Sequence, residues 1–238
     1  MTFLPSVNYV RNLGLQALPY LVCIFCVFIT IALYYALIVS PVDYQQGEYV
    51  RIMYVHVPAA WLALFIYCIM ASCSFSTIIW GTKLSYLIAV SIAPIGCAFS
   101  LITLITGSLW GYPVWGTYWV WDARLTSMLV LFFFYLAYIA IINAESNILR
   151  AEKPSSVIAL LGVINIPIVK FSVKFWHSLH QPDSIITANG PQIHPTMLIP
   201  LILMFISYLL YVIINVILHY NNIISNLQHD SRSNRSLY

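Results

Sequence analysis

The stretch LPYLVCIFCVFITIALYYALIV, residues 18–39, contains no charged side chain. An α-helix rises about 1.5 Å per residue, so about 20 apolar residues are enough to cross the ~30 Å hydrocarbon core of a bilayer. Later stretches of similar length and very low charge occupy residues 58–80, 84–106, 123–143, 155–173 and 197–218. The fifth stretch in the chain is the least regular, because Pro167 and Lys170 lie near its end. We expect Lys170 to extend toward the membrane surface.

The composition supports a membrane protein and excludes other classes. Hydrophobic residues make up 61% of the 238 residues and charged residues only 7%, whereas about 25% of residues in soluble domains are charged. A membrane β-barrel would instead show alternating segments of about ten residues. The net charge of +3 is too small and too scattered for nucleic acid binding. The sequence predicts an all-α, polytopic protein with six transmembrane helices in a single membrane domain, residues 1–238.

The distribution of Lys and Arg predicts which side each loop faces, because these residues are retained on the cytoplasmic side. With both termini cytoplasmic, the loops and termini on that side hold six of the ten cations, namely Arg11, Lys83, Arg150, Lys153, Arg232 and Arg235. The outer side then holds Arg51, Arg124, Lys170 and Lys174. We therefore expect cytoplasmic termini, with residues 219–238 as a short polar cytoplasmic tail, and functional residues in the outer loops.

The outer loop between the third and fourth spans is rich in tryptophan. It reads GSLWGYPVWGTYWVWDARLTS, residues 107–127, and holds four of the seven tryptophans, Trp110, Trp115, Trp119 and Trp121. We expect its glycines and Pro113 to end the third helix near Thr106, and the segment to lie in the membrane interface. If helical, the segment would place Trp115, Tyr118, Trp119 and Asp122 on one face. The alternative is an ordinary aromatic belt, with Asp122 as the N-cap of the fourth span.

The histidines favour a binding site over a belt. His56 precedes Pro58, a residue that suits the first position of a helix, and the positive helix N-terminus disfavours imidazolium. His177, His180 and His194 lie in the outer loop after the fifth span. Two neutral imidazoles from different loops, beside an aromatic surface, match what an iron porphyrin requires: stacking for the ring and one nitrogen on each side of the metal. A zinc site is the competing interpretation, but few outward Cys, Asp or Glu residues lie near these histidines.

Several motifs together resemble the heme exporter protein C (CcmC) family of the cytochrome c maturation system. WGTYWVWDARLTS, residues 115–127, is similar to the tryptophan-rich WWD signature of heme-handling proteins in cytochrome c assembly. YVHVPAAW at residues 54–61 and SLHQ at residues 178–181 indicate this family in particular. The resemblance covers nearly the whole chain, because DYQQG (43–47), APIG (93–96) and TGSLWG (106–111) also match.

This resemblance implies a function and a set of site residues. His56 and His180 would be the axial ligands of heme b. The loop residues Trp110, Trp115, Trp119, Trp121, Asp122 and Arg124 would form the heme platform and the docking surface for a periplasmic heme chaperone. Partners would be the ATPase and permease subunits of an ABC transporter and a small single-span membrane subunit. The expected location is the bacterial inner membrane, or the mitochondrial inner membrane for an organelle-encoded chain, with the heme site on the outer face.

Two other functions remain as alternatives. Cys23 and Cys26 form a C-x-x-C pattern within the first span, which leaves a transmembrane thiol relay as one alternative. A small-molecule permease is the other, although Pro94 and Gly96 in the third span are its only indication. The sequence contains no G-x-x-x-x-G-K-[ST] motif, so ATP hydrolysis would belong to partner subunits. We expect a binding and transfer protein rather than an enzyme.

Overall fold

The computed structural model describes residues 4–176, 178–180, 185 and 190–236, and these are almost entirely helical. Six helical segments are long and apolar enough to cross a membrane, at Val7–Val39, Glu48–Trp80, Lys83–Trp115, Ala123–Ala144, Glu152–Phe175 and Pro195–His229. The described residues form no β-strand, only an isolated bridge between Asp43 and Gly47. The prediction of an all-α protein with six membrane-spanning helices is confirmed.

The spans are built from seven α-helices. Their bounds are α1 Leu4–Tyr34, α2 Met53–Trp80, α3 Lys83–Trp115, α4 Ala123–Ala144, α5 Glu152–Leu161, α6 Asn165–Phe175 and α7 Pro195–Ser236. A π-helical turn, Tyr35–Val39, extends α1, and a 3-10 turn, Glu48–Ile52, leads into α2. The fifth span consists of α5 and α6, joined by the 3-10 turn Gly162–Ile164. Pro167 explains this break, because it has no N–H to bond to the carbonyl of Val163.

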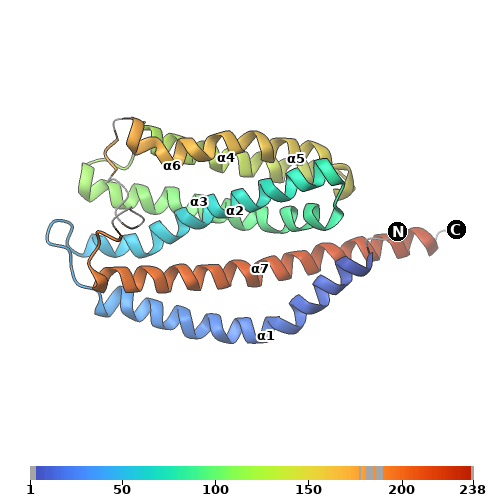
Figure 1. The fold of residues 1–238 in the computed structure, drawn as a ribbon, viewed down its shortest axis with the longest axis horizontal. Coiled ribbons are helices and arrows are strands. Elements are labelled where there is room, and N and C mark those ends of the chain that lie inside the picture. The colour runs from blue at the N-terminus through green and yellow to red at the C-terminus, as the bar shows by residue number, and fades with distance from the viewer. Residues whose placement is uncertain (1–3, 177, 181–184, 186–189, 237–238) are drawn as a thin grey trace.

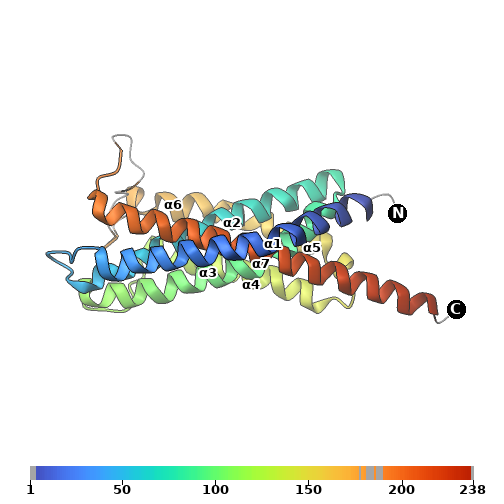
Figure 2. The same ribbon diagram turned by 90° about the horizontal axis from the view of Figure 1, so that it is seen from below.

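The helices lie side by side in one elongated bundle (Figure 1). The helices α2 and α3 pair along their length, α4, α5 and α6 pack on one side of them, and α7 packs on the other. Helix α1 packs mainly against α7 at the edge of the bundle, as the view from below also shows (Figure 2). Both ends of the chain lie at the same end of the bundle. The opposite end carries the loops that the sequence analysis singled out.

The centre of the bundle is packed with tyrosines against glycines. The rings of Tyr67 on α2 and Tyr135 on α4 meet edge to face, with centroids 5.0 Å apart. Tyr135 also donates a hydrogen bond of 2.8 Å to the carbonyl of Ala63. A Cβ at Gly96 would lie 2.3 Å from Tyr135 Oη, and one at Gly162 would lie 1.9 Å from Tyr67 Oη. These two glycines therefore allow the tyrosine rings to lie against the helix backbones.

The third helix is longer than the sequence indicated. It continues through Gly107, Gly111 and Pro113 and ends at Trp115, where Gly116 adopts a positive φ of 73°. The expectation that the third helix ends near Thr106 is therefore wrong. The first two glycines provide room for neighbouring rings instead of breaking the helix, since a Cβ at Gly111 would lie 2.8 Å from the Trp115 ring. Residues after Gly116 turn toward α4 without helical structure, so the loop presents no continuous helical face.

Two other helix limits also differ from expectation. Helix α2 begins at Met53, so His56 lies in its first turn and Pro58 lies inside the helix rather than at its first position. Pro58 costs one backbone hydrogen bond near the helix start, and burial of Met53 and Tyr54 stabilises the extra turn. At the other end of the chain, α7 continues as helix to Ser236 and includes the polar segment after residue 218.

Candidate functional site

A cavity of about 270 Å³ lies where α2, α3, α4 and α6 meet, at the end of the bundle away from the termini. Both histidines that the resemblance selected line it, together with three of the four loop tryptophans and two cations. These residues are His56, Trp110, Trp115, Trp119, Arg124, Lys170 and His180. Apolar residues such as Leu64, Leu104, Met128 and Val169 form much of the remaining wall. The cavity is therefore mostly apolar, with a few polar groups that converge on it.

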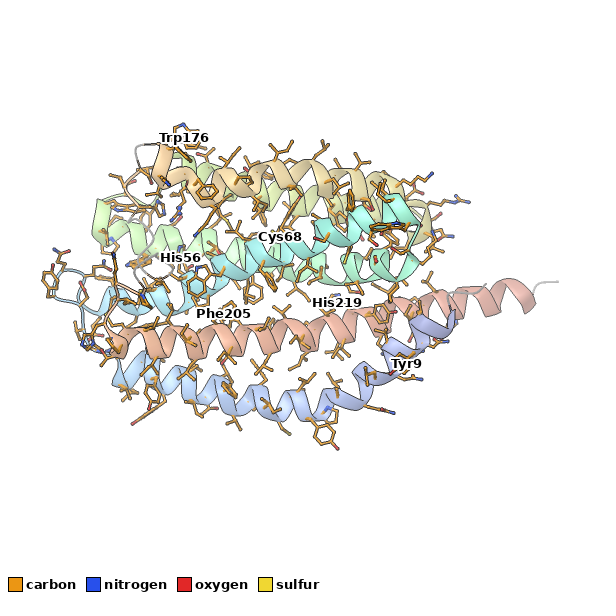
Figure 3. The ribbon with its side chains drawn as sticks, viewed as in Figure 1. Tyr9, His56, Cys68, Trp176, Phe205 and His219 are labelled. Atoms are coloured by element: carbon orange, nitrogen blue, oxygen red, sulfur yellow. The ribbon has the colours of Figure 1, made fainter. Side chains whose placement is uncertain are left out.

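His56 reaches the cavity from the first turn of α2, and Figure 3 shows it toward the loop end of the bundle. Its Nδ1 lies 3.1 Å from Thr106 Oγ1 on α3. The rings of Trp110 and His56 pack edge to face, with centroids 5.8 Å apart. Gly107 makes room for the ring, because a Cβ there would lie 2.9 Å from His56 Cε1. Helix α3 therefore fixes the position of a histidine that belongs to α2.

His180 reaches the cavity from the loop after α6. Its Nδ1 lies 3.2 Å from Asp122 Oδ2, and its side chain is 18% exposed. Ser178 Oγ donates to the same carboxylate oxygen at 2.5 Å and accepts the backbone N–H of His180 at 3.1 Å. The ring of Trp115 packs edge to face against the imidazole at a centroid distance of 4.8 Å. Two segments distant in the sequence thus hold His180 in place.

Asp122 has two structural roles at once. Its Oδ1 accepts the backbone N–H of Leu125 at 2.8 Å, so it is the N-cap of α4, and its Oδ2 bonds to Ser178 and His180. Burial by itself raises the pKa of this carboxyl, but the bonds from Leu125, Ser178 and His180 lower the pKa on balance. The pKa of His180 is lowered by burial, although Asp122 opposes that change. At neutral pH the pair is therefore a carboxylate beside a neutral imidazole.

The four loop tryptophans occupy different positions. Trp110 and Trp115, on the last turns of α3, pack against His56 and His180 and line the cavity. Trp119 also lines the cavity, and its buried Nε1 has no hydrogen-bond partner among the described residues. Trp121 packs edge to face on Trp119 at 5.5 Å, is 79% exposed, and does not line the cavity. Tyr118 stacks on Tyr112 at 4.3 Å, outside the cavity lining.

Two other histidines lie outside this arrangement. His194 precedes α7, where its Nδ1 bonds to Thr196 Oγ1 at 2.8 Å, and it does not line the cavity. His219 lies on α7 farther along the bundle, nearer the termini (Figure 3). His177, the alternative to His180, lies outside the described residues. Cys23 and Cys26 of the C-x-x-C pattern are free thiols exposed on α1.

Comparison with known proteins identifies the family. Residues 2–235 match the family model CcmC, heme exporter protein C. The chain belongs to this family. It is 45% identical over 212 residues to heme exporter protein C of Bradyrhizobium diazoefficiens, which covers 88% of this chain and 80% of that protein. It is 42% identical over 184 residues to heme exporter protein C of Escherichia coli K12, with 77% of this chain and 74% of that protein covered.

A third relative comes from a plant. The putative cytochrome c biosynthesis ccmC-like mitochondrial protein of Marchantia polymorpha is 48% identical over 185 residues, which cover 77% of this chain and 78% of the relative. The family resemblance inferred from the sequence motifs is therefore confirmed. Relatives with bacterial and with mitochondrial names match to a similar degree.

Three of the sequence motifs on which the family resemblance was based have a visible structural role in this chain. In DYQQG, Asp43 Oδ1 accepts the backbone N–H groups of Gln45 and Gln46, and Gln46 Oε1 accepts Trp110 Nε1–H at 2.8 Å. In APIG, Gly96 makes room for the Tyr135 ring. In TGSLWG, Thr106 contacts His56. The motifs therefore either shape the cavity or pack the bundle beneath it.

Sequence reasoning missed four residues of the site. Gln46 and Lys170 line the cavity, Thr106 contacts His56, and Ser178 bonds to Asp122. Thr106, Ser178 and Gln46 lie inside quoted motifs, but only the contacts between motifs reveal what they do. The sequence analysis considered Lys170 only as a side chain that extends toward the membrane surface and gave it no place in the site, but it lines the cavity.

Proposed function

We propose that this chain binds heme b at the outer face of the membrane and presents it to a periplasmic heme chaperone for the maturation of c-type cytochromes. His56 and His180 are the axial ligands in this proposal. The chain performs no bond-making reaction of its own, and ATP hydrolysis belongs to the transporter subunits. The names of the relatives, heme exporter protein C and cytochrome c biosynthesis protein, support the general role.

The observation that carries the proposal is the convergence of two imidazoles on one aromatic cavity. His56 and His180 lie 124 positions apart in the sequence, and both line the same cavity. Each imidazole packs edge to face with a tryptophan ring. An iron porphyrin requires one nitrogen on each side of the metal and apolar contact around its ring, and this wall supplies both kinds of group.

The two cations of the cavity support the same ligand. Heme b carries two propionate groups, which are anionic at neutral pH. Arg124 and Lys170 add positive charge to an otherwise apolar wall. Arg124 Nε also donates to Ser172 Oγ at 3.4 Å, so α4 and α6 hold this side chain between them. A porphyrin without carboxylates would have no anionic group to pair with these two cations.

The exposed part of the loop supports the chaperone as the receiving partner. Trp121 is 79% exposed beside Trp119, which lines the cavity. Exposed tryptophans are frequent anchors of protein interfaces. A chaperone bound at Trp121 would lie next to the heme that it receives. The ABC transporter pair and the single-span subunit complete the proposed complex on the basis of the family resemblance.

Absorption spectroscopy of the detergent-purified protein tests the proposal. We expect bound heme with the low-spin spectrum of bis-histidine coordination, and we expect the apo chaperone to remove it. Heme-free protein that takes up no hemin, or a high-spin spectrum from the intact chain, would contradict the proposal. The thiol relay makes a different prediction, in which replacing all five cysteines by Ala abolishes cytochrome c maturation. Normal maturation in that variant would dismiss the relay.

A further inference from the structure

The two histidines share one feature that coordination alone does not require. Each imidazole directs its Nδ1 at an oxygen of a neighbouring segment, at 3.1 Å for His56 and Thr106 and at 3.2 Å for His180 and Asp122. A neutral imidazole carries a single N–H, and its other nitrogen has the lone pair that binds metal. The group opposite Nδ1 therefore decides whether Nε2 is available to a ligand in the cavity.

At His56 this group is a hydroxyl whose hydrogen is already used. Thr106 Oγ1 donates to the carbonyl of Ile102, one helical turn earlier, at 2.6 Å. The oxygen can then only accept, so His56 carries its hydrogen on Nδ1 and its lone pair on Nε2. The partner is neutral. It orients the ring but adds little electron density to it.

At His180 the acceptor is a carboxylate that also accepts two other hydrogen bonds from protein groups. Asp122 accepts Leu125 N–H on Oδ1 and accepts both Ser178 Oγ–H and His180 Nδ1–H on Oδ2. Its side chain is 8% exposed, so protein groups rather than water provide these bonds. A charged acceptor fixes the tautomer more strongly than a neutral one and increases the basicity of the opposite nitrogen.

We propose that Asp122 is a positioning residue that holds His180 in the Nδ1–H tautomer and makes its Nε2 the stronger donor of an unequal axial pair, whereas His56 is oriented by neutral groups of α3, among them the hydroxyl of Thr106. The inference rests on the proposed heme coordination and deepens it. In this proposal the aspartate of the WWD signature acts on His180 of the SLHQ segment rather than on the tryptophans next to it in the sequence.

Substitution of Asp122 by Asn separates this role from simple helix capping. Asn caps a helix about as well as Asp, so an N-cap role alone predicts no change. Asn has only one side-chain oxygen, so it cannot serve both the Leu125 side and the His180 side. If its amide N–H₂ faces Nδ1, it favours the tautomer of His180 that carries the hydrogen on Nε2. Nε2 then has no lone pair available to bind iron.

We expect Asp122→Asn to lower heme affinity by about 10- to 100-fold, the usual loss when the partner of a ligating histidine is removed. The heme that remains should turn largely high-spin, and any low-spin fraction should have a higher reduction potential than the wild type. Ser178→Ala is the control that keeps the charge. It removes one bond to the same carboxylate together with the Ser178 Oγ contacts to the backbone N–H and Nδ1 of His180, and it should lose several-fold less affinity than Asp122→Asn. Affinity, spin state and potential all equal to the wild type in Asp122→Asn would overturn the inference.

A ligand-exchange experiment tests the unequal pair with Asp122 intact. In His180→Gly and in His56→Gly, added imidazole can occupy the vacated axial position, whereas 1-methylimidazole binds iron but has no N–H to donate. We expect the preference for imidazole over 1-methylimidazole to be several-fold larger in His180→Gly than in His56→Gly. Equal preferences would overturn the inference even if Asp122→Asn does not accumulate.

These measurements also distinguish failure of the inference from failure of the proposed function. If wild-type protein shows no bis-histidine heme, or if His180→Gly retains the wild-type spectrum, the coordination itself is wrong. If the wild type is low-spin and both glycine variants lose that spectrum, coordination stands. The comparison of imidazole with 1-methylimidazole and the Asp122→Asn spectrum then decide the role of Asp122 alone.

Discussion

The polar and charged side chains at the two ends of the bundle lie in different surroundings. At the end that holds the termini, Lys83 on α3 pairs with Glu152 on α5, and Arg11 on α1 donates to Asn221, Ser225 and Gln228 of α7. These groups satisfy one another and tie helices together. The other end instead surrounds a cavity with imidazoles, cations and a buried indole N–H that has no partner within the described chain.

This difference indicates that side chains at the end with the termini stabilise helix packing, whereas side chains at the loop end are available to bind a ligand. Buried polar groups are normally hydrogen-bonded, and exceptions often mark a functional site. The Trp119 Nε1–H is such an exception, and its ring lines the cavity on which both histidines converge. The other buried side chains without a partner among the described residues lie outside the cavity lining, namely Tyr67, Ser74, Tyr138 and Ser156. We therefore expect changes at the loop end to alter heme handling with little loss of stability. Changes at the other end should do the reverse.

The strongest test of this comparison is the topology. A reporter fused after Lys83 or after Lys153 should be active only in the cytoplasm, and one fused near Gly111 should be active only outside, because six of the ten cations lie on the side of the termini. Paired cytoplasmic and periplasmic reporters at each position provide the control. Cytoplasmic activity of a reporter fused near Gly111 would show that the loop end faces the cytoplasm. A periplasmic chaperone could then not contact the proposed heme site.

The next largest effect is expected from the histidines. His56→Ala and His180→Ala should each lose most bound heme or convert it to a high-spin form, because each removes one of two axial nitrogens. His194→Ala and His219→Ala serve as controls, since neither side chain lines the cavity. The measurement is heme content and absorption spectrum per amount of purified protein. A requirement for His177 in place of His180 would show that the assignment within this loop is wrong.

Gly107→Ala tests whether the helix α3 surface positions His56. The new Cβ would lie 2.9 Å from His56 Cε1, closer than side chains tolerate, so the imidazole has to move. We expect the bound heme to become partly high-spin while the protein still accumulates in the membrane. Gly116→Ala is not a suitable control because of its positive φ, whereas Leu109→Ala changes an exposed α3 side chain that does not line the cavity and should retain the low-spin spectrum.

The tryptophans should divide into two functional groups. Trp119→Ala removes a ring from the cavity wall and should weaken heme retention several-fold, since aromatic contacts contribute about 0.5 to 1.5 kcal/mol beyond buried area. Trp121→Ala removes an exposed ring and should leave retention near that of the wild type but slow transfer to the chaperone. Heme dissociation rates and chaperone loading, measured on equal amounts of protein, separate the two effects. Equal behaviour of both variants would favour a diffuse aromatic belt.

The bundle could be predicted from the sequence more completely than the site. Apolar length determines membrane spans because the bilayer imposes the same requirement on every helix, so six spans follow from counting residues. Helix limits were less predictable, as at Gly107 and Gly111. A glycine can end a helix or can lie within one and make room for a neighbouring ring, and only the tertiary packing decides which. The pairings of Asp122 with His180 and of Thr106 with His56 join segments far apart in the chain. Their spacing in the sequence carries no signal of contact.

The smallest effect on heme is expected at the end that holds the termini. Glu152→Gln removes the partner of Lys83, whose side chain is 33% exposed, so we expect a loss of about 1 to 3 kcal/mol in stability rather than the full cost of an isolated buried charge. The bound heme should keep its low-spin spectrum, because the cavity lies at the other end of the bundle. Glu145→Gln removes the same charge from an exposed position and should change neither property. Thermal inactivation in detergent, followed in parallel with the heme spectrum, measures both. A Glu152→Gln protein with normal thermal stability and an altered spectrum would show that the two ends are coupled, and the division of roles between them would fail.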